Sequence, residues 1–399
     1  MKKIFTILSL AVVFVTCYGN KPSSLYTTSF AKNKEIKIAM LLPLFYENID
    51  ELSFNEYNID EKRSKNYKCF SYISFYEGAR IALDNLEKQG YKIKLYVFDV
   101  GENDEKKMQR ALSYSQMKDM DLIIPLVFKQ SFALVSSFCQ TNNIPLINPM
   151  SQDSSILQNP YVFKIQPDEH TMSAALMNYV KQRGNASKII VLYDDKITSS
   201  SILNYWKEHL PAVSEKWTII NYRKNAMKLK NYISKDDDNV VINLINKSNE
   251  QDAKLYAQSV INSLLQTKCP ITLVANYDWL NYVGNDLKQL QSLKFHFSLP
   301  YYNDYTNENF IEFVKQFRDN FDTEPDKIYA ALGFDLIIYF LPLISAHGKE
   351  FVANPINTKQ QKMIARYKFE RAGTDKGWQN INTTIYKLDN YKIKSCWSY

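Results

Sequence analysis

The residue types that most often carry catalysis or bind metals are few and scattered in this chain. The 399 residues include five cysteines without a C-x-x-C pair and four histidines far apart in the sequence, His170, His209, His296 and His347. This spacing is not that of a zinc site or of a Ser–His–Asp triad. Neither G-x-G-x-x-G nor G-x-x-x-x-G-K-[ST] occurs, so no phosphate-binding loop is predicted. The sequence therefore predicts a protein that is not an enzyme, with no metal and no cofactor.

Composition indicates an ordinary globular protein with more than one core. Hydrophobic residues make up 45% of the chain and charged residues 23%, with a net charge of +7. No arginine-rich stripe or nucleic-acid motif accompanies this mild positive charge, so no nucleic-acid partner is predicted. A chain of this length is long for one hydrophobic core, and two domains are expected.

The amino terminus has the pattern of an export signal. Met1-Lys2-Lys3 precedes an apolar run, Ile4–Val15, that is too short to span a bilayer as a helix. We predict a signal peptide over residues 1–19, with two cleavage positions open. Cleavage before Cys17, which follows a loose bacterial lipobox, makes Cys17 the lipidated residue; ordinary signal cleavage falls after Gly19. Residues 20–35 are polar and suit a tether, and any membrane contact is through the lipid anchor alone.

Four further cysteines leave two alternatives open. In an exported protein Cys69, Cys139, Cys269 and Cys396 could form one or two disulfides. Buried thiols are equally compatible, because Cys139 falls on an apolar helix face and Cys269 precedes an apolar strand.

Apolar strands and amphipathic helices alternate along most of the chain. This order predicts parallel βαβ units, and hence open sheets with helices on both faces. Ligands on such sheets bind at the carboxyl ends of the strands. Residues 46–71 form a long polar insert after the first strand, and the last 35 residues predict short strands. The expected strands include 37–44, 93–99, 122–126, 145–148, 188–193, 218–222, 240–246, 271–275 and 295–299.

The order of these segments resembles the type I periplasmic-binding-protein family, as in the branched-chain amino-acid-binding proteins of ABC importers. The matching stretches are Lys37–Leu44, Tyr76–Asn85, Asn143–Ser151, Tyr161–Glu169, Tyr193–Asp195 and Gly333–Asp335. The chain also resembles Bacteroidetes envelope lipoproteins of this fold. The resemblance implies two Rossmann-like α/β lobes with mainly parallel sheets, joined by a three-crossing hinge. Lobe one is expected at 36–165 plus 300–355, and lobe two at 166–299 plus 356–399.

The resemblance also implies where a ligand binds. In amino-acid-binding members, two loops of lobe one hold the ligand carboxylate, while lobe two supplies an acidic residue for the ammonium group and aromatic packing. Two departures occur: Ile124 and Phe128-Lys129 flank Pro125, where the family usually has Gly and Ser/Thr, and Thr198-Ser199-Ser200 replaces an aromatic–glycine pair. The ligand-binding residues implied are Phe128, Lys129, Ser151 and Gln152 in lobe one, and Ser199, Asn246, Tyr277, Asp278 and Trp279 in lobe two.

Several of these residues have a plain structural alternative. Lys129 could be a solvated loop lysine, Ser151 a turn residue, and Asp278 the cap of a helix that begins near Trp279. Ser131 is expected to be the N-cap of the next helix.

The resemblance implies an exported solute-binding protein that holds a small polar ligand, amino-acid-like or peptide-like, in an interlobe cleft. Its partners would be that ligand and an ABC permease or another envelope protein, and its place the periplasm or, lipid-anchored, the outer membrane. The alternative is an envelope scaffold without a ligand that regulates peptidoglycan machinery through protein contacts. The altered loop around Pro125 and the long insert favour the scaffold. The retained Pro149-Met150-Ser151 and the Tyr277–Trp279 cluster favour the binder.

Overall fold

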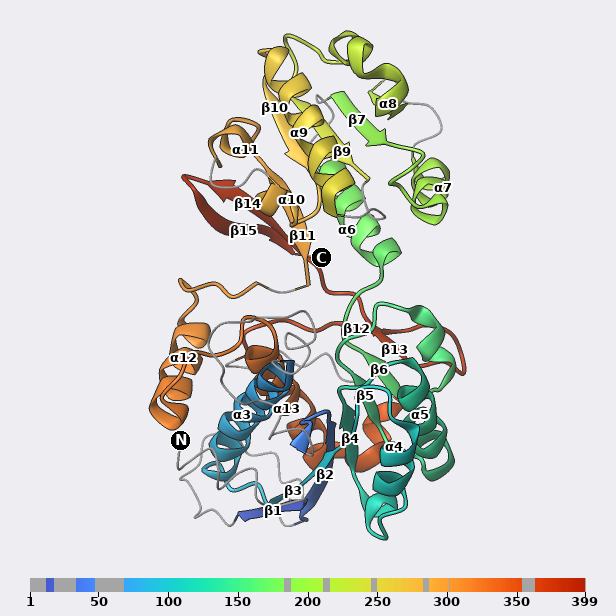
Figure 1. Cartoon of the computed structure of the whole chain (residues 1–399), viewed down its shortest axis with the longest axis vertical. Helices are drawn as coiled ribbons and strands as arrows, with labels where there is room; N and C mark the ends of the chain where they lie inside the picture. Colours follow the sequence, from blue (N-terminus) through green and yellow to red (C-terminus); the bar gives the residue numbers. More distant parts are fainter. Residues whose placement is uncertain are drawn as a thin grey trace, which may run out of the picture. The chain divides into compact units, whose positions relative to one another are not determined.

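A computed structural model describes residues 12–17, 34–46, 68–182, 188–210, 216–244, 250–282, 287–300, 302–353 and 363–398. The chain divides into two compact units (Figure 1). Unit 1 comprises Met1–Gln166 and Tyr305–Asn380, and unit 2 comprises Pro167–Asp304 and Ile381–Tyr399. The backbone therefore passes from one unit to the other three times.

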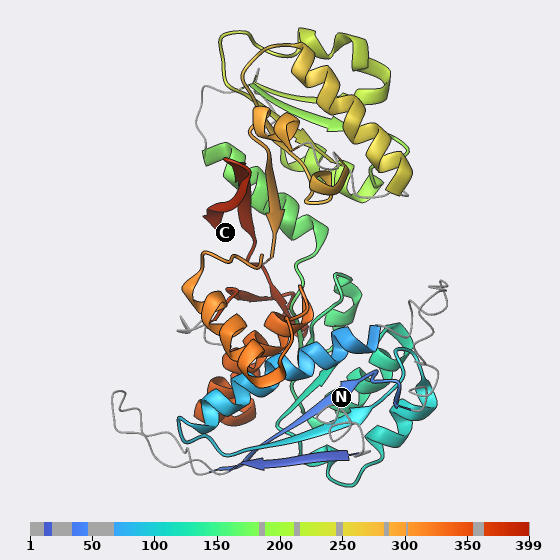
Figure 2. The same cartoon turned by 60° about the vertical axis from the view of Figure 1, so that its left-hand side comes forward.

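Unit 1 contains one sheet with helices on both of its faces (Figures 1 and 2). Its strands are β1 (Val12–Cys17), β2 (Ile36–Leu42), β3 (Ile93–Asp99), β4 (Leu122–Pro125), β5 (Leu146–Asn148), β6 (Val162–Lys164), β12 (Phe369–Arg371) and β13 (Trp378–Asn380). Its helices and 3₁₀ turns are α3 (Lys68–Glu87), α4 (Glu105–Leu112), η2 (Met117–Asp119), α5 (Lys129–Asn142), η3 (Ser154–Gln158), α12 (Glu308–Phe321), α13 (Tyr329–His347) and η5 (Gly348–Val352).

Unit 2 has the same kind of architecture. Its strands are β7 (Lys188–Tyr193), β8 (Trp217–Asn221), β9 (Asn239–Asn243), β10 (Ile271–Val274), β11 (His296–Leu299), β14 (Thr384–Asp389) and β15 (Lys392–Ser398). Its helices and 3₁₀ turns are α6 (Glu169–Gln182), α7 (Ser200–His209), α8 (Tyr222–Asn225), η4 (Ala226–Asn231), α9 (Glu250–Gln266), α10 (Trp279–Tyr282) and α11 (Lys288–Ser292).

The strand orders are those of doubly wound sheets. Unit 1 has the order β1-β3-β2-β4-β5-β6-β13-β12, and unit 2 has β15-β14-β11-β10-β9-β7-β8. The central strands are parallel, while β1, β12, β14 and β15 pair antiparallel with their neighbours. The predicted fold class, two mainly parallel α/β units, is confirmed. In each unit the order reverses once, between β2 and β4 and between β7 and β9, which is where open sheets usually bind ligands.

The side chains of β2 point alternately to the two faces of the sheet and so contribute to two separate halves of the core of unit 1. Ile38, Met40 and Leu42 face the layer that contains α3, α12 and α13, whereas Ala39 and Leu41 face α4 and α5. Both faces of the strand are thus buried, as its near-continuous apolar sequence predicts. Strand β7 does the same in unit 2, with Ile190 and Leu192 toward α9 and Ile189 and Val191 toward α6 and α7.

The boundaries of the two units differ from those predicted for the lobes at three places. Among the described residues, 300 and 302–304 fall in unit 2, whereas 166 and 363–380 fall in unit 1, the reverse of the expectation. The reason is that β13 pairs in parallel with β6, with Trp378 opposite Phe163, and extends the sheet of unit 1. Strands β6 and β13 have three residues each, too few for a sequence alternation to reveal them.

Other elements differ from the prediction at their ends. Helix α3 begins at Lys68, so the last residues of the predicted insert, 68–71, are already helical. Residues 47–67 of that insert lie outside the described residues. The four cysteines beyond Cys17 form no disulfide with one another in the described part of the chain.

The segment predicted as an export signal supplies an edge strand. Strand β1 pairs antiparallel with β3, with Val12 opposite Phe98 and Cys17 opposite Ile93. Cleavage before Cys17 would remove most of β1 and leave β3 at the edge of the sheet. The side chains of β3 would not change their faces, because β3 also pairs in parallel with β2 along its whole length.

Helix α13 and the turn that follows it form a strongly apolar segment, Tyr329–Val352. An 18-residue stretch of it has a mean hydropathy of 1.7, apolar and long enough to cross a membrane, yet 78% of that stretch is buried inside the protein. It packs side by side with α3 at the centre of unit 1 (Figure 2). The segment is therefore a core helix.

Candidate functional site

In unit 1 the first loop at the carboxyl edge follows β2 and is held by a carboxylate at the end of β3. Asp99 accepts hydrogen bonds from the backbone N–H groups of Leu44 (2.8 Å), Phe45 (3.2 Å) and Tyr46 (2.9 Å). Phe45 has a φ of 54°, a left-handed conformation that the carboxylate fixes. These three donors are already used within the protein, so Asp99 is a residue that shapes the edge.

The second loop leads from β4 into α5 and contains Phe128 and Lys129. Phe128 is the N-cap residue and its side chain is 49% exposed, but it has no atom that could cap the helix. Lys129 is exposed in the first turn. Within the described part of the chain, the backbone N–H groups of Lys129 and Gln130 donate no hydrogen bond, and such groups at a helix start attract anions. The Lys129 ammonium group and the backbone N–H groups of Lys129 and Gln130 thus lie together at the start of α5, next to the point where the strand order of unit 1 reverses.

Ser131 does not cap this helix, contrary to the expectation. It lies two residues inside α5 and is fully buried, and its hydroxyl oxygen has no partner among the described residues. Its backbone N–H donates to the Asn103 Oδ1 atom at 3.4 Å, so Asn103 partly replaces the missing cap.

The third loop, after β5, contains Ser151 and Gln152. Asn148 Oδ1 accepts from the backbone N–H groups of Met150 (3.2 Å) and Ser151 (2.7 Å). The Ser151 hydroxyl accepts from the backbone N–H of Asp153 at 3.1 Å, and Gln152 is exposed. Ser151 therefore fulfils the turn role that was the alternative, while its O–H hydrogen is still able to donate to a ligand.

Two buried polar groups of unit 1 were not found from the sequence. The Tyr72 hydroxyl donates to a carboxylate oxygen of Glu102, and burial raises the pKa of Tyr72 far above its usual range. The Lys164 side chain is fully buried at the end of β6 and donates to the Gln166 backbone oxygen at 2.7 Å. Neither residue stands in a recognisable motif: the partner of Tyr72 lies 30 positions away, and the burial of Lys164 depends on the packing around β6.

In unit 2 the loop after β7 is hydrogen-bonded to the end of β9, and β7 and β9 are the two strands between which the strand order reverses. The Thr198 hydroxyl donates to the backbone oxygen of Leu244, just after β9, at 2.6 Å. Ser199 is the N-cap of α7, and its hydroxyl accepts from the Ile202 N–H at 3.3 Å. Ser199 is thus at the expected edge but is engaged in capping. Asn246 lies outside the described residues.

The loop after β10 contains the three remaining predicted residues. Tyr277 is half-buried and makes an edge-to-face contact with Phe297, with ring centroids 5.3 Å apart. Asp278 is exposed, and its backbone oxygen accepts from Asn281 and Tyr282 in the short helix α10.

Trp279, which the resemblance implied as a ligand contact, does not present its ring at this edge. Its side chain is fully buried in the apolar core of unit 2, where it packs as one of the largest enclosed groups. The two aromatic residues after β10 therefore have different roles. Trp279 is part of the core, and Tyr277 lies at the border of that core.

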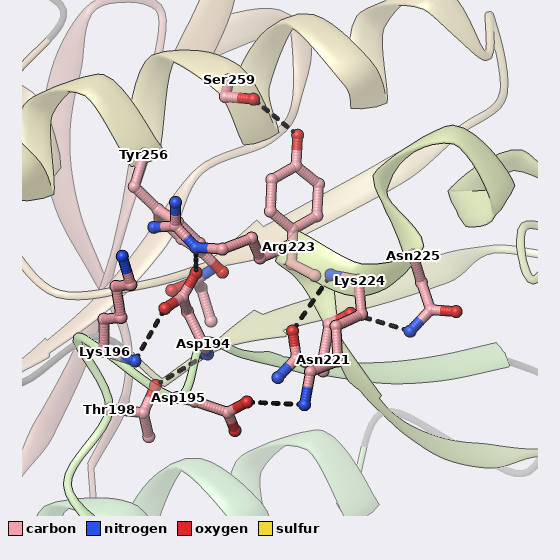
Figure 3. A network of polar contacts seen from close by, with 12 residues as sticks. Asp194, Asp195, Lys196, Thr198, Asn221, Arg223, Lys224, Asn225, Tyr256 and Ser259 are labelled. Carbon is pink, nitrogen blue, oxygen red and sulfur yellow. Dashed lines mark hydrogen bonds and ion pairs between the residues drawn. The ribbon is translucent and has the colours of Figure 1, made fainter.

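A network of charged side chains stands at the same edge of unit 2 (Figure 3). Asp194, which directly follows β7, is 1% exposed and accepts from Arg223 Nε at 2.6 Å and from the Lys196 N–H at 2.8 Å. Lys224 pairs with Asp195 at 2.8 Å, and each of these two partners moves the pKa of the other away from neutrality: that of Asp195 is lowered and that of Lys224 raised. In the described part of the chain no group of three His, Cys, Asp or Glu side chains could hold a metal ion.

Comparisons with known proteins agree with this geometry. A family model described as periplasmic binding protein matches residues 67–218. A branched-chain amino acid ABC transporter protein from Rhodospirillum rubrum superposes with a TM-score of 0.64 at 12% identity, covering 91% of this chain and 100% of that chain. This chain has the type I periplasmic-binding-protein fold.

Two further solved structures share this periplasmic-binding-protein fold and contain ligands. A substrate-binding protein from Desulfitobacterium hafniense in complex with Leu has a TM-score of 0.52 at 14% identity and covers 91% of this chain and 100% of that chain. A solute-binding protein from Rhodopseudomonas palustris BisB5 in complex with 3,4-dihydroxy benzoic acid has a TM-score of 0.52 at 13% identity, covering 92% and 97%. No curated protein matches the sequence.

Proposed function

We propose that this protein is an exported solute-binding protein of the ABC transporter type, whose ligand is a small amino acid or organic acid. The observation that carries the proposal is the pair of doubly wound sheets, each with polar groups at the carboxyl edge where the strand order reverses. The likeness to a family model of periplasmic binding proteins supports it.

Unit 1 offers groups suited to a carboxylate. The uncapped first turn of α5 presents backbone N–H groups beside Lys129, and Ser151 presents a hydroxyl on the neighbouring loop. Leucine and 3,4-dihydroxy benzoic acid, the ligands of two structurally similar proteins, both carry a carboxylate. We propose Phe128, Lys129, Ser151 and Gln152 as ligand contacts from unit 1, and Ser199, Asn246, Tyr277 and Asp278 from unit 2.

A thermal-shift panel tests this function. Purified protein would be melted with L-leucine, other amino acids, benzoate derivatives, dicarboxylates, sugars and nucleosides. A ligand at about 100 times its Kd adds about 2.7 kcal/mol of stability, which raises the melting temperature by several degrees. For a ligand found this way, we expect Lys129→Ala to weaken binding about tenfold, because a charged donor at the anion end is lost.

Lys118→Ala is the matched control, because Lys118 is an exposed lysine of the same unit in η2. Equal effects of the two substitutions would remove Lys129 from the site. A panel without any shift would contradict the solute-binding function and favour an envelope scaffold.

We also propose that the chain is exported and lipidated at Cys17, with an ABC permease as its partner. Cys17→Ser removes the thiol to which a lipid is attached, so we expect the protein to move from the membrane fraction to the soluble fraction. One acyl chain gives weak attachment, and stable anchoring requires more than one. Metabolic labelling with a palmitate analogue and fractionation of cells would measure this. Membrane association that is the same in Cys17→Ser would contradict lipidation.

A further inference from the structure

We propose that Arg223 is an anion-recognition residue of unit 2, so that the ligand presents a carboxylate or phosphate group to this unit. This inference rests on the solute-binding function proposed above. It differs from the acidic residue that resemblance to the family implies for this lobe, because it assigns a cation to that role.

The first step is the orientation of the guanidinium group. Asp194 is 1% exposed and holds Arg223 through Nε at 2.6 Å, while the Arg223 side chain is 57% exposed. Among the described residues, Nε is the only nitrogen of this guanidinium that donates a hydrogen bond. The two terminal Nη groups of the fork are therefore available, and their planar geometry matches the two oxygens of a carboxylate or phosphate.

The second step is the rigidity of the support. The Asp194 carboxylate also accepts from the Lys196 N–H, and the Asp194 N–H donates to Thr198 Oγ1 at 3.1 Å. Thr198 in turn donates to the Leu244 backbone oxygen. The anchor of the guanidinium is thus fixed to the ends of both β7 and β9, where the strand order reverses (Figure 3). Such preorganisation lowers the entropic cost of binding.

The third step is the local charge. Asp194 is matched by Arg223 and Asp195 by Lys224, and Lys196 adds a further exposed cation on the loop after β7. Asp278 follows β10, three strands away from β8 in the sheet order, which places it beyond the reach of a short contact with Arg223. The surplus charge beside Arg223 is positive and suits an anion.

Isothermal titration calorimetry of the purified protein tests the assignment. The probes are L-leucine, succinate, 3,4-dihydroxybenzoate and inorganic phosphate. We expect at least one anion to bind, and Arg223→Lys to weaken it about 30-fold, because lysine keeps the charge but loses the fork. The identity of the anion separates a carboxylate ligand from a phosphate ligand.

Arg110→Lys in α4 of unit 1 is the matched control, since Arg110 is exposed and lies on a different unit. Arg223→Gln, which retains a planar donor for Asp194, is the second variant if Arg223→Lys does not fold. If a probe binds the wild type, and both variants bind it with a Kd within about threefold of the wild-type value, Arg223 only forms an ion pair within the protein and the assignment is wrong. If no probe binds the wild type although the thermal-shift panel gives a ligand without an anionic group, the assignment of Arg223 is wrong and the solute-binding function stands. If the panel also gives no shift, both fail.

Discussion

Gly333→Ala is expected to destabilise unit 1 by about 3 kcal/mol, although alanine favours a helix by about 1 kcal/mol over glycine. The reason is the close approach of α3 and α13. A Cβ atom at Gly333 would lie 2.1 Å from the Phe75 backbone oxygen and 3.2 Å from the Ala79 nitrogen. Backbone atoms cannot rotate away as a side chain can, so the two helices must separate. Thermal unfolding followed by circular dichroism would measure the loss.

Two comparisons make this prediction specific. Gly373→Ala is the control, because a Cβ there would approach only the flexible side chain of Lys376, at 3.2 Å, and should change stability by less than about 0.5 kcal/mol. Gly78 occupies the facing position, where a Cβ would lie 1.9 Å from the Ala330 backbone oxygen. Because both substitutions separate the same helices, the double variant should lose less than the sum of the two. A neutral Gly333→Ala would contradict this packing.

Asp335→Asn is the second change with a large expected effect, about 2–3 kcal/mol of stability. Asp335 lies in the middle of the apolar helix α13 and is 1% exposed. Its two carboxylate oxygens accept from the backbone N–H groups of Ile364 (2.8 Å) and Ala365 (2.6 Å). Asparagine supplies one acceptor and turns an NH₂ donor toward the other N–H, so one buried group loses its partner. Denaturant unfolding near pH 5 would measure this, because the wild-type carboxyl group is still protonated there and no buried charge offsets the loss. Asp319→Asn on the exposed face of α12 is the control.

The same residue makes stability depend on pH. Burial raises the pKa of Asp335 to about 7, against an ordinary value near 4 in the unfolded chain. Between these values the folded state binds a proton that the unfolded state has released, so stability falls as pH rises from about 4 to about 7. Above that range the cost of the buried charge is fully present. Asp335→Asn should lack this component of the slope, and an identical pH profile in both proteins would contradict the raised pKa.

The sequence by itself determined the architecture to a considerable degree. The apolar runs of β2, β4, β7 and β9 are buried on both faces, and helices α4, α5 and α12 each bury residues spaced three or four apart. These patterns depend only on residues close in the chain, so they can be read without knowing the fold. The loops at which to search for a ligand follow from the same order of elements.

The roles of individual residues within those loops were not determined in this way. Tyr277 and Trp279 are both aromatic and only two residues apart, yet Trp279 is enclosed in the core while Tyr277 lies at its border, because the path of α10 sets the direction of each side chain. Ser131 has the residue type of an N-cap, but α5 begins two residues earlier, so its hydroxyl is buried. A shift of two residues at a helix end is enough to change a cap into an interior residue.

Contacts between distant residues were decided by tertiary structure alone. Asp194 meets Arg223 from 29 positions away, and Asp99 holds the loop at Leu44 from 55 positions away. Strand β13 joins β6 across more than 200 residues with only three residues in each strand. Periodicity fixes which face of an element is buried, because that depends on local spacing. Which polar groups meet at the ends of the strands depends on how the sheet is ordered, and no local pattern contains that information.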